Sequence, residues 1–182
     1  MTGVGIRALG PDDADACDRI VAGLPYHFAL EQGRLDCAVA VRRDPGLVAD
    51  QDGEVLGFLK YVYRFDEAAE ITWMAVRADR RRGGIGHALI DRLAERLAAE
   101  GRRVLMVLTV SPSDPGPEPE DGYGSTRAFY RSTGFVLGRD LRGEWDSDTA
   151  VLMVRALHTE PPPIRRTASP GRLSPDRRRT AP

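Results

Sequence analysis

The hydrophobic and polar positions follow two different periods along the chain, and they predict a fold that mixes strands and helices. The first apolar stretch, Ile6 to Leu9, predicts a strand. Proline and acidic residues then predict the start of a helix from about Pro11 to Ala22. The pattern from Gly23 to Arg43 is weak and supports only a short helix that opens at residues 25–28. This second helix is the element that the pattern defines least.

Three apolar runs joined by short turns predict antiparallel strands next. Gly46 to Asp50 and Val55 to Phe65 flank an Asp-Gly pair, which is a good short-range signal for a hairpin. The chain turns again through residues 66–69, and a third strand begins at Glu70 and ends at Val76. A switch from strand to helix follows this third strand.

The helical period continues from His87 to Glu100, where Leu89, Leu93 and Leu97 share one stripe. Gly101 stands where a left-handed cap ends such a helix. The next run, residues 104–108, is continuously apolar and is typical of a strand buried on both faces. A strand, a helix and a strand at this spacing predict a right-handed crossover connection.

The last part of the folded chain contains one more helix and two more strands. Four prolines make residues 111–122 a loop, and a helix follows from Ser125 to Thr133. Gly134 ends this helix. The apolar runs Phe135 to Leu137 and Val151 to Val154 predict the remaining strands.

Length and composition fit one globular domain. A chain of 182 residues with 42% hydrophobic and 29% charged residues buries a sizeable core, and a net charge of -1 gives no argument for nucleic acid. No apolar run has the length of a signal peptide or a membrane span, so we expect a cytoplasmic protein without a membrane partner. Cys17 and Cys37 show neither metal-ligand spacing nor a disulfide framework, and we expect no metal.

The C-terminal segment differs from the rest of the chain. Residues 158–182 hold six arginines against two acidic residues, a formal charge of +4, together with six prolines and no aromatic residue. Such a composition cannot bury enough apolar surface to offset the entropy of ordering. We therefore expect a folded domain over residues 1–157 and a disordered tail over residues 158–182.

The stretch Arg81-Arg82-Gly83-Gly84-Ile85-Gly86 lies between the third strand and the long helix. Backbone N–H groups at a helix start lack intrahelical partners, and together with the helix dipole and the arginines they form a site for phosphate or pyrophosphate. A flexible charged turn, whose glycines only ease the change of direction, is the alternative. Taken alone, the stretch does not decide between these two interpretations.

Two motifs in this order resemble the GCN5-related N-acetyltransferase (GNAT) family. The central family motif is Arg or Gln, two variable residues, Gly, one variable residue, and Gly or Ala, which is matched here by residues 81–86. A second signature, an aromatic-Tyr pair followed by Gly-Phe, is matched by Phe129-Tyr130 and Gly134-Phe135. The resemblance covers Ile6 to Leu157. It implies an α/β (α+β) fold with a mixed, mostly antiparallel sheet flanked by helices, and a splayed strand pair at the cofactor site.

The resemblance also implies a binding site for acetyl-CoA. Backbone N–H groups of residues 82–87 would hold the pyrophosphate, with Gly84 and Gly86 allowing close approach, and the third strand would pair with the pantetheine arm where the neighbouring strands part beyond Met74. Many family members carry Asn and Ala where this chain has Tyr123 and Thr126, so a hydroxyl of Tyr123 or Ser125 replaces that contact, or Tyr123 is purely structural. The cofactor-binding candidates are Met74, Ala75, Val76, Arg81, Arg82, Gly83, Gly84, Ile85, Gly86, His87, Tyr123 and Thr126.

By the same resemblance, two residues are candidates for the chemistry. Glu70, at the start of the third strand, would remove a proton from the amine directly or through a water, with Glu67 and Glu144 as weaker substitutes. Tyr130 would give a proton to the departing thiolate of coenzyme A. A paired surface glutamate and a core tyrosine are the structural alternatives. Neither cysteine lies in the motif region, so we expect direct transfer through a ternary complex.

The leading hypothesis is an acetyl-CoA-dependent N-acetyltransferase that acts on an amine of a small molecule or a protein, as a monomer or a homodimer. A non-catalytic acyl-CoA sensor of the same fold is the alternative. A dinucleotide site fits poorly, because no acidic residue ends the strand at residues 104–108. His27, Tyr26, Phe28 and Trp145 are aromatic candidates for the acceptor side, and packing is the alternative role for each.

Overall fold

The computed structural model describes residues 3–113, 122–145 and 149–157. The tail that we expect to be disordered, residues 158–182, lies outside these ranges. The strands are β1 (Gly5–Ala8), β2 (Gly46–Gln51), β3 (Glu54–Phe65), β4 (Ala68–Val76), β5 (Val104–Val110), β6 (Val136–Leu141) and β7 (Ala150–Ala156). The helices are α1 (Ala14–Ala22), α2 (Glu31–Arg43), α3 (Ile85–Ala99) and α4 (Gly122–Ser132), with short 3-10 turns η1 (Pro11–Asp13) and η2 (Ala78–Arg80).

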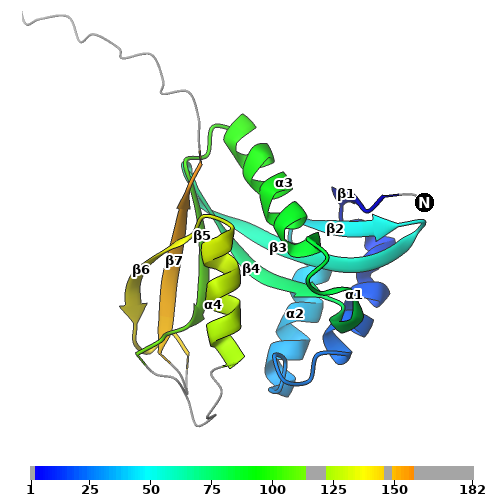
Figure 1. The fold of residues 1–182 in the computed structure, drawn as a ribbon, viewed down its shortest axis with the longest axis horizontal. Coiled ribbons are helices and arrows are strands. Elements are labelled where there is room, and N and C mark those ends of the chain that lie inside the picture. The colour runs from blue at the N-terminus through cyan, green and yellow to red at the C-terminus, as the bar shows by residue number, and fades with distance from the viewer. Residues whose placement is uncertain (1–2, 114–121, 146–148, 158–182) are drawn as a thin grey trace, which may run out of the picture.

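All seven strands form one sheet in the order β1-β2-β3-β4-β5-β7-β6 (Figure 1). Only β4 and β5 pair in parallel, and α3 connects them as the crossover that the sequence predicts. Every other neighbouring pair is antiparallel. The expected mixed and mostly antiparallel sheet is therefore confirmed. Within the described ranges, no helix combines the length and apolar character needed to cross a membrane.

Several elements differ from the sequence-based expectation. The helix α4 begins at Gly122 rather than Ser125, and β6 extends to Leu141 rather than ending at Leu137. Residues 25–28 form turns rather than a helix, and α2 begins later and runs for 13 residues. Its apolar residues do not form one clean stripe, because Leu35 and Val39 are more than half exposed whereas Cys37 and Val41 are buried. The third strand starts earlier than expected, at Ala68, because residues 68–69 already pair with both β3 and β5.

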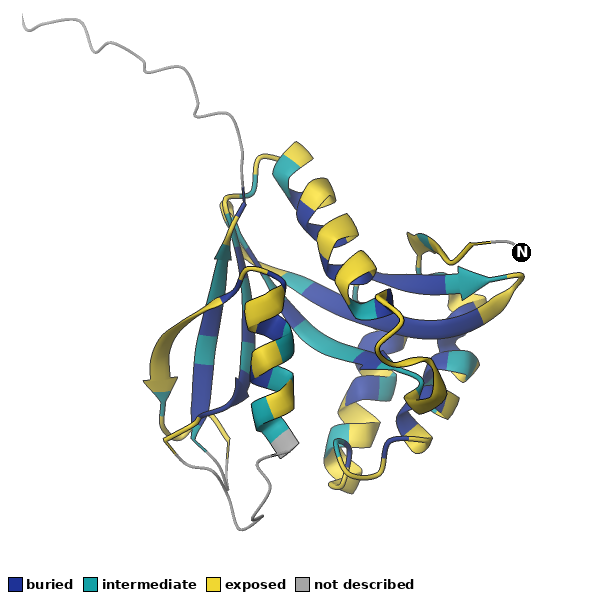
Figure 2. Ribbon diagram, in the orientation of Figure 1, coloured by how far each residue is buried: buried dark blue, intermediate teal, exposed yellow. Residues whose placement is uncertain are grey.

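Two apolar clusters form the core, one on each face of the sheet. Alternate residues of one strand enter different clusters: Leu47 and Ala49 of β2 join one, and Val48 between them joins the other. The first cluster contains the buried residues of α3 and reaches from β2 to β7. The second cluster contains α1 and α2 and includes no buried residue beyond Ala75. Figure 2 shows the buried strands between the two layers of helices.

The sheet separates at its parallel pair. The β4–β5 ladder starts at Ala68–Val104 and ends at Ile71–Val107, although β4 continues to Val76. A β-bulge accounts for this position, because Ile71 and Trp73 pair with consecutive residues of β3 and Thr72 is the extra residue between them. The strands therefore part directly after Ile71, three residues earlier than expected.

A buried lysine ties α2 to the sheet. Lys60 of β3 is 1% exposed, and its Nζ donates to the carbonyl oxygens of Val41, at 3.2 Å, and Asp44. These carbonyls lie at the end of α2, where the last helical C=O groups have no intrahelical partner. Burial lowers the pKa of Lys60. The ammonium group thus fixes the end of the helix that follows the α1–α2 connection.

Candidate functional site

A cavity of about 680 Å³ lies where β4 and β5 part. Its walls come from the α1–α2 connection, the end of β4, the loop and first turn of α3, and α4. Most of the residues predicted to bind a cofactor line it, namely Met74, Ala75, Val76, Arg81, Arg82, Gly84, Ile85, Gly86, His87 and Thr126. Gly83 lies between two lining residues in the chain and Tyr123 lies two residues before the first lining residue of α4, but neither is part of the wall.

The first turn of α3 faces the cavity with free backbone donors. Gly84 caps the helix with a φ of 81°, and the first helical hydrogen bond runs from Ala88 N to Gly84 O at 3.0 Å. The N–H groups of residues 85–87 therefore precede any intrahelical partner. Arg80, Arg81 and Arg82 line the same cavity, so the helix start combines donors, a helix dipole and positive charge. This is the composition of an anion-binding helix terminus.

Gly86 has a second reason to be glycine, besides the close approach of a ligand. A Cβ atom at this position would lie 2.9 Å from both Cε2 and Cζ of Phe129. Any side chain here would force the Phe129 ring or one of the two helices to shift, because real Cβ atoms are not found that close to another heavy atom. Gly86 thus sets the distance between the two helices that form the cavity walls.

His27 adds no positive charge to the cavity. Burial, together with the nearby charge of Arg81, lowers the pKa of His27, so the imidazole is neutral near pH 7. The His27 ring contacts Tyr26 edge-on, at 5.4 Å between centroids, and Tyr123 at 6.3 Å. The second contact joins the α1–α2 connection to the start of α4. His27 therefore adds no charge to that of the arginines that line the cavity.

Tyr130 lies in the wall that α4 contributes. It is 6% exposed, and its ring packs against Phe129 and Phe135 with centroids 5.3 and 5.4 Å away. Burial raises the pKa of Tyr130, so the phenol keeps its proton at neutral pH. A protonated phenol at the edge of a cavity is able to donate a hydrogen bond or a proton to a group within it.

Glu70 does not line this cavity. It pairs with Val62 on one side and Met106 on the other, one residue before β4 and β5 part. Its carboxylate is 13% exposed, and Oε2 lies 2.6 Å from Nε of Arg64. The structure therefore places Glu70 beside the start of the gap rather than in the cavity wall. Its role as a base stays a prediction.

Aromatic side chains form the part of the wall near the α1–α2 connection. Phe28 lines the cavity and stacks on Trp73, with centroids 6.0 Å apart and planes inclined by 24°. Trp73 is also the first β4 residue after the bulge. The acceptor-side candidates Phe28 and His27 thus reach the cavity, whereas Tyr26 and Trp145 do not line it.

A few lining residues are absent from the sequence-based set. On α4, Ala128, Phe129 and Ser132 share a face with Ser125 and Thr126 at intervals of three or four residues. Helical spacing from the predicted Thr126 would have found them. Leu24 and Arg80 carry no such signal, because their place in the wall depends on the path of two loops.

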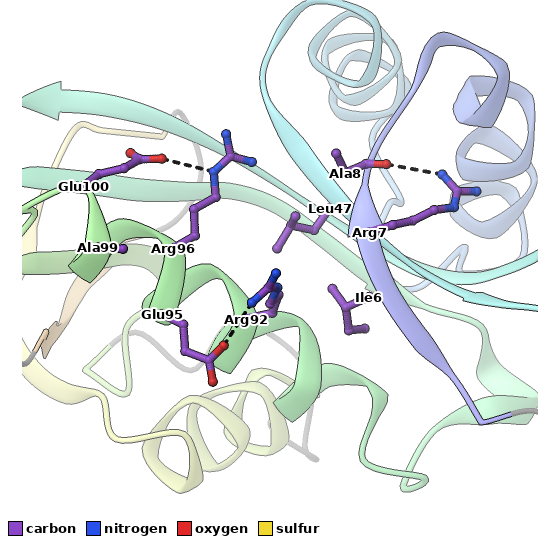
Figure 3. A pocket seen from close by; sticks show the side chains of 9 residues that line it. All are labelled: Ile6, Arg7, Ala8, Leu47, Arg92, Glu95, Arg96, Ala99 and Glu100. Atoms are coloured by element: carbon purple, nitrogen blue, oxygen red, sulfur yellow. Dashed lines mark hydrogen bonds and ion pairs between the residues drawn. The ribbon is translucent and has the colours of Figure 1, made fainter.

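A second cavity, of about 510 Å³, lies between β1, β2 and α3 (Figure 3). Ile6 and Leu47 line it together with Arg92 and Arg96. Each of these arginines is paired on its own helix, at 3.3 Å with Glu95 and at 3.1 Å with Glu100. None of the predicted catalytic or cofactor-binding residues lines this cavity.

Comparison with known proteins gives a family and a fold. A family model described as an acetyltransferase (GNAT) domain matches residues 42–137. A candidate GNAT-family acetyltransferase from Desulfovibrio desulfuricans aligns with a TM-score of 0.72 at 20% identity, over 86% of this chain and 100% of that one. The ribosomal-protein-S18-alanine N-acetyltransferase from Escherichia coli gives 0.67 at 20% identity, over 85% and 94%. An aminoglycoside 6′-N-acetyltransferase complexed with coenzyme A gives 0.64 at 14% identity, over 87% and 99%.

Proposed function

Because the chain belongs to the GCN5-related N-acetyltransferase family, we propose that it transfers the acetyl group of acetyl-CoA directly to a primary amine of a small molecule or a protein. The observation that carries this proposal is the cavity at the parting of β4 and β5, which combines an anion-binding helix start with an unpaired strand edge. A ligand with a pyrophosphate at one end and an amide-containing arm fits this combination. Acetyl-CoA has both parts.

Different residues of the cavity wall bind different parts of acetyl-CoA. The N–H groups of residues 85–87 and the charges of Arg81 and Arg82 bind the pyrophosphate. Met74, Ala75 and Val76 pair with β3 on one side but have no β5 partner on the other, so this edge of β4 is available to the pantetheine arm. Thr126, and Tyr123 or Ser125, contribute hydroxyl groups from α4.

The chemistry needs a proton acceptor, a proton donor and a site for developing negative charge. Glu70 accepts the proton of the ammonium group, directly or through a water. Tyr130 donates to the thiolate that leaves, and its protonated phenol suits that role. A backbone N–H of β4 near Met74 stabilises the negative charge on the acetyl oxygen. The amine nitrogen forms the new C–N bond as the C–S bond of the thioester breaks.

The acceptor belongs to one of two broad classes. The E. coli neighbour is an acetyltransferase for an alanine of a ribosomal protein, and the coenzyme A complex is an aminoglycoside acetyltransferase. Phe28, which lines the cavity and stacks on Trp73, offers an apolar surface for either class. Both protein amines and small-molecule amines therefore belong in the search for the acceptor.

A thiol-release screen tests the proposal. Purified protein is incubated with acetyl-CoA and panels of amines, amino acids, aminoglycosides and peptides, and free coenzyme A is measured. We expect turnover with at least one acceptor, and calorimetry to detect acetyl-CoA binding that the substitution Gly84→Glu abolishes through steric block and charge repulsion. Unchanged affinity in Gly84→Glu would refute the cofactor site. Binding without turnover on every panel would favour the acyl-CoA sensor.

A further inference from the structure

Arg64 occupies an irregular position at the end of β3. Tyr63 pairs with Ala69 and Phe65 pairs with Ala68, so Arg64 is an extra residue without a partner in the ladder. Such a bulge bends the strand and re-aims the side chain that it carries. Here the re-aimed side chain meets Glu70 of the neighbouring strand, with Nε 2.6 Å from Oε2.

The backbone of Glu70 is held more firmly than that of its neighbours further along β4. It is paired on both sides, with Val62 and Met106, whereas the bulge at Thr72 and the loss of β5 pairing follow within two residues. The carboxylate itself has several rotatable bonds. Its position therefore depends on side-chain contacts.

Arg64 makes its contact with one oxygen only. Within the described part of the chain, Oε2 receives the Arg64 hydrogen bond and Oε1 receives none. The Glu70 side chain is 13% exposed and that of Arg64 is 49% exposed. The pair thus lies at the border of the core, where an ion pair is less screened than one between two fully exposed side chains. One carboxylate oxygen is anchored and the other remains available.

We propose that Arg64 is a positioning residue for acetyl transfer: it anchors Oε2 of Glu70 so that Oε1 faces the acceptor amine at the gap between β4 and β5. This inference rests on the proposed function and assigns a role to a residue outside both sequence motifs. Arg64 touches neither substrate. It acts through the orientation of the carboxylate.

A double-mutant cycle tests the proposal in steady-state kinetics with the acceptor found by the screen. Arg64→Gln lowers kcat about tenfold, because a misplaced catalytic group costs one to two orders of magnitude, and it leaves KM for acetyl-CoA unchanged. Glu70→Gln lowers kcat more, by about 10²-fold or above. Adding Arg64→Gln to Glu70→Gln causes no further loss, because the arginine has nothing left to position.

Two further variants separate positioning from general effects of charge. Arg64→Lys restores most of kcat, since a single nitrogen makes the contact and an ammonium group is able to replace it. Arg92→Gln removes an arginine that is 60% exposed on α3 and paired with Glu95, so it controls for the change in net charge and leaves kcat unchanged.

The outcomes distinguish this inference from the proposed function. If the wild type turns over and Arg64→Gln keeps kcat within about twofold, or loses the same factor with and without Glu70, the positioning role is wrong and the proposed function stands. If the wild type releases no thiol with any acceptor, the proposed function fails and this inference fails with it.

Discussion

Two buried tyrosines of the same core differ in what their hydroxyl groups reach. Tyr61 of β3 is fully buried, and its hydroxyl has no hydrogen-bond partner among the described residues. Tyr130 of α4 is 6% exposed and lines the cavity. Both rings belong to the same core cluster, and a phenylalanine at either position keeps the ring and removes only the hydroxyl. The pair therefore offers a matched comparison of hydroxyl function.

We expect Tyr130→Phe to lower kcat by about 10²-fold, because the departing thiolate loses its proton donor. KM for acetyl-CoA should change little. Tyr61→Phe removes an unpartnered hydroxyl and should leave kcat unchanged, with stability equal or higher. Steady-state kinetics and urea unfolding of both variants check the expectation. Equal kcat values in Tyr130→Phe and the wild type would leave Tyr130 with a packing role only.

Substitution by alanine should affect stability differently at Gly86 and at Gly83. Alanine at Gly86 forces Phe129 to move, and such overpacking costs about 1–3 kcal/mol. The higher helix propensity of alanine offsets part of this cost. At Gly83 the nearest atom to a new Cβ is the Arg80 carbonyl oxygen, at 3.4 Å. We expect Gly86→Ala to lower the free energy of unfolding by about 1 kcal/mol or more and Gly83→Ala to leave it nearly unchanged. Urea titration measures the free energy of unfolding of both variants. Equal values would show that Phe129 and α4 move aside at little cost.

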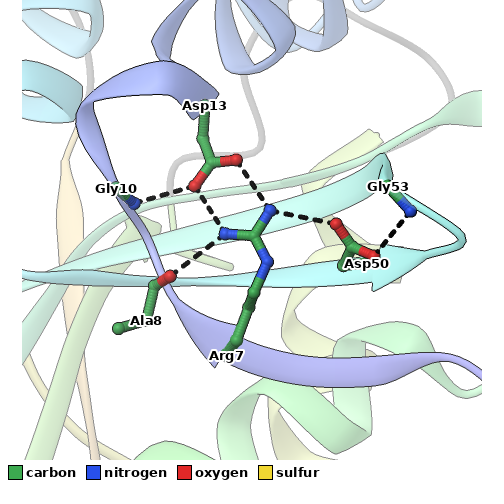
Figure 4. Close-up of polar contacts among 6 residues, drawn as sticks. All are labelled: Arg7, Ala8, Gly10, Asp13, Asp50 and Gly53. Carbon is green, nitrogen blue, oxygen red and sulfur yellow. Dashed lines mark hydrogen bonds and ion pairs between the residues drawn. The ribbon is translucent and has the colours of Figure 1, made fainter.

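Among the elements, β1, η1 and β2 are joined by one arginine (Figure 4). Arg7 makes two parallel hydrogen bonds to Asp13, at 2.7 and 2.8 Å, and a third to Asp50 at 2.9 Å. Asp13 also accepts the backbone N–H of Gly10 at 2.7 Å. Its side chain is only 10% exposed. The hydrogen bonds from Arg7, and then that from Gly10, lower the pKa of Asp13 against the opposing effect of burial.

A depressed pKa in the folded state means that the stabilising contribution of Asp13 is present above its unfolded pKa, near 4, and is lost as pH falls through the folded value. We therefore expect Asp13→Asn to lower the free energy of unfolding by about 2 kcal/mol at pH 7, and by less as pH falls below 4. Urea titrations between pH 7 and pH 3 check this. Asp12→Asn, at an exposed neighbour in the same turn, is the control. A difference between Asp13→Asn and the wild type that is independent of pH would contradict the assignment.

The contrast between α3 and α2 shows which elements the sequence is able to predict. The buried residues of α3 repeat at helical spacing and its end is marked by Gly101, so a local pattern is sufficient. The exposed apolar residues Leu35 and Val39 hide the period of α2. The α2 helix is instead stabilised by contacts from elsewhere in the chain, including the Lys60 ammonium at its end. A local pattern cannot reveal such contacts.

The candidate site divides in the same way. The glycine stretch and Tyr130 are found from the sequence, because each belongs to a motif of consecutive residues. The ion pair of Arg64 and Glu70 depends on a bulge in β3, and the point where β4 and β5 part depends on a bulge at Thr72. Each bulge is an irregularity in pairing between two strands. Alternation within a single strand does not indicate it.

At the scale of the whole molecule, the number of residue pairs that join neighbouring strands differs from one part of the sheet to another. Eight residue pairs join β3 to β4 and seven join β5 to β7, but four join β4 to β5, which is as few as join the edge strand β1 to β2. The core cluster that contains α1 and α2 includes no buried residue of β5 or of any later element. Only the cluster beneath α3 reaches across the β4–β5 pair.

The short β4–β5 ladder means that the candidate cavity lies where two parts of the sheet are joined by only four residue pairs. The apolar core of β5, β7 and α4 joins the rest of the molecule on one face of the sheet, whereas residues 14–75 contain a second core cluster of their own. A molecule bound in the gap between β4 and β5 would contact the parts of the protein on both sides of it. Because it binds only the folded state, the gain in stability grows with the logarithm of its concentration. If that molecule is acetyl-CoA, as proposed, resistance to heat and to proteases would follow its supply, and the lifetime of the protein in a cell would depend on the availability of acetyl-CoA.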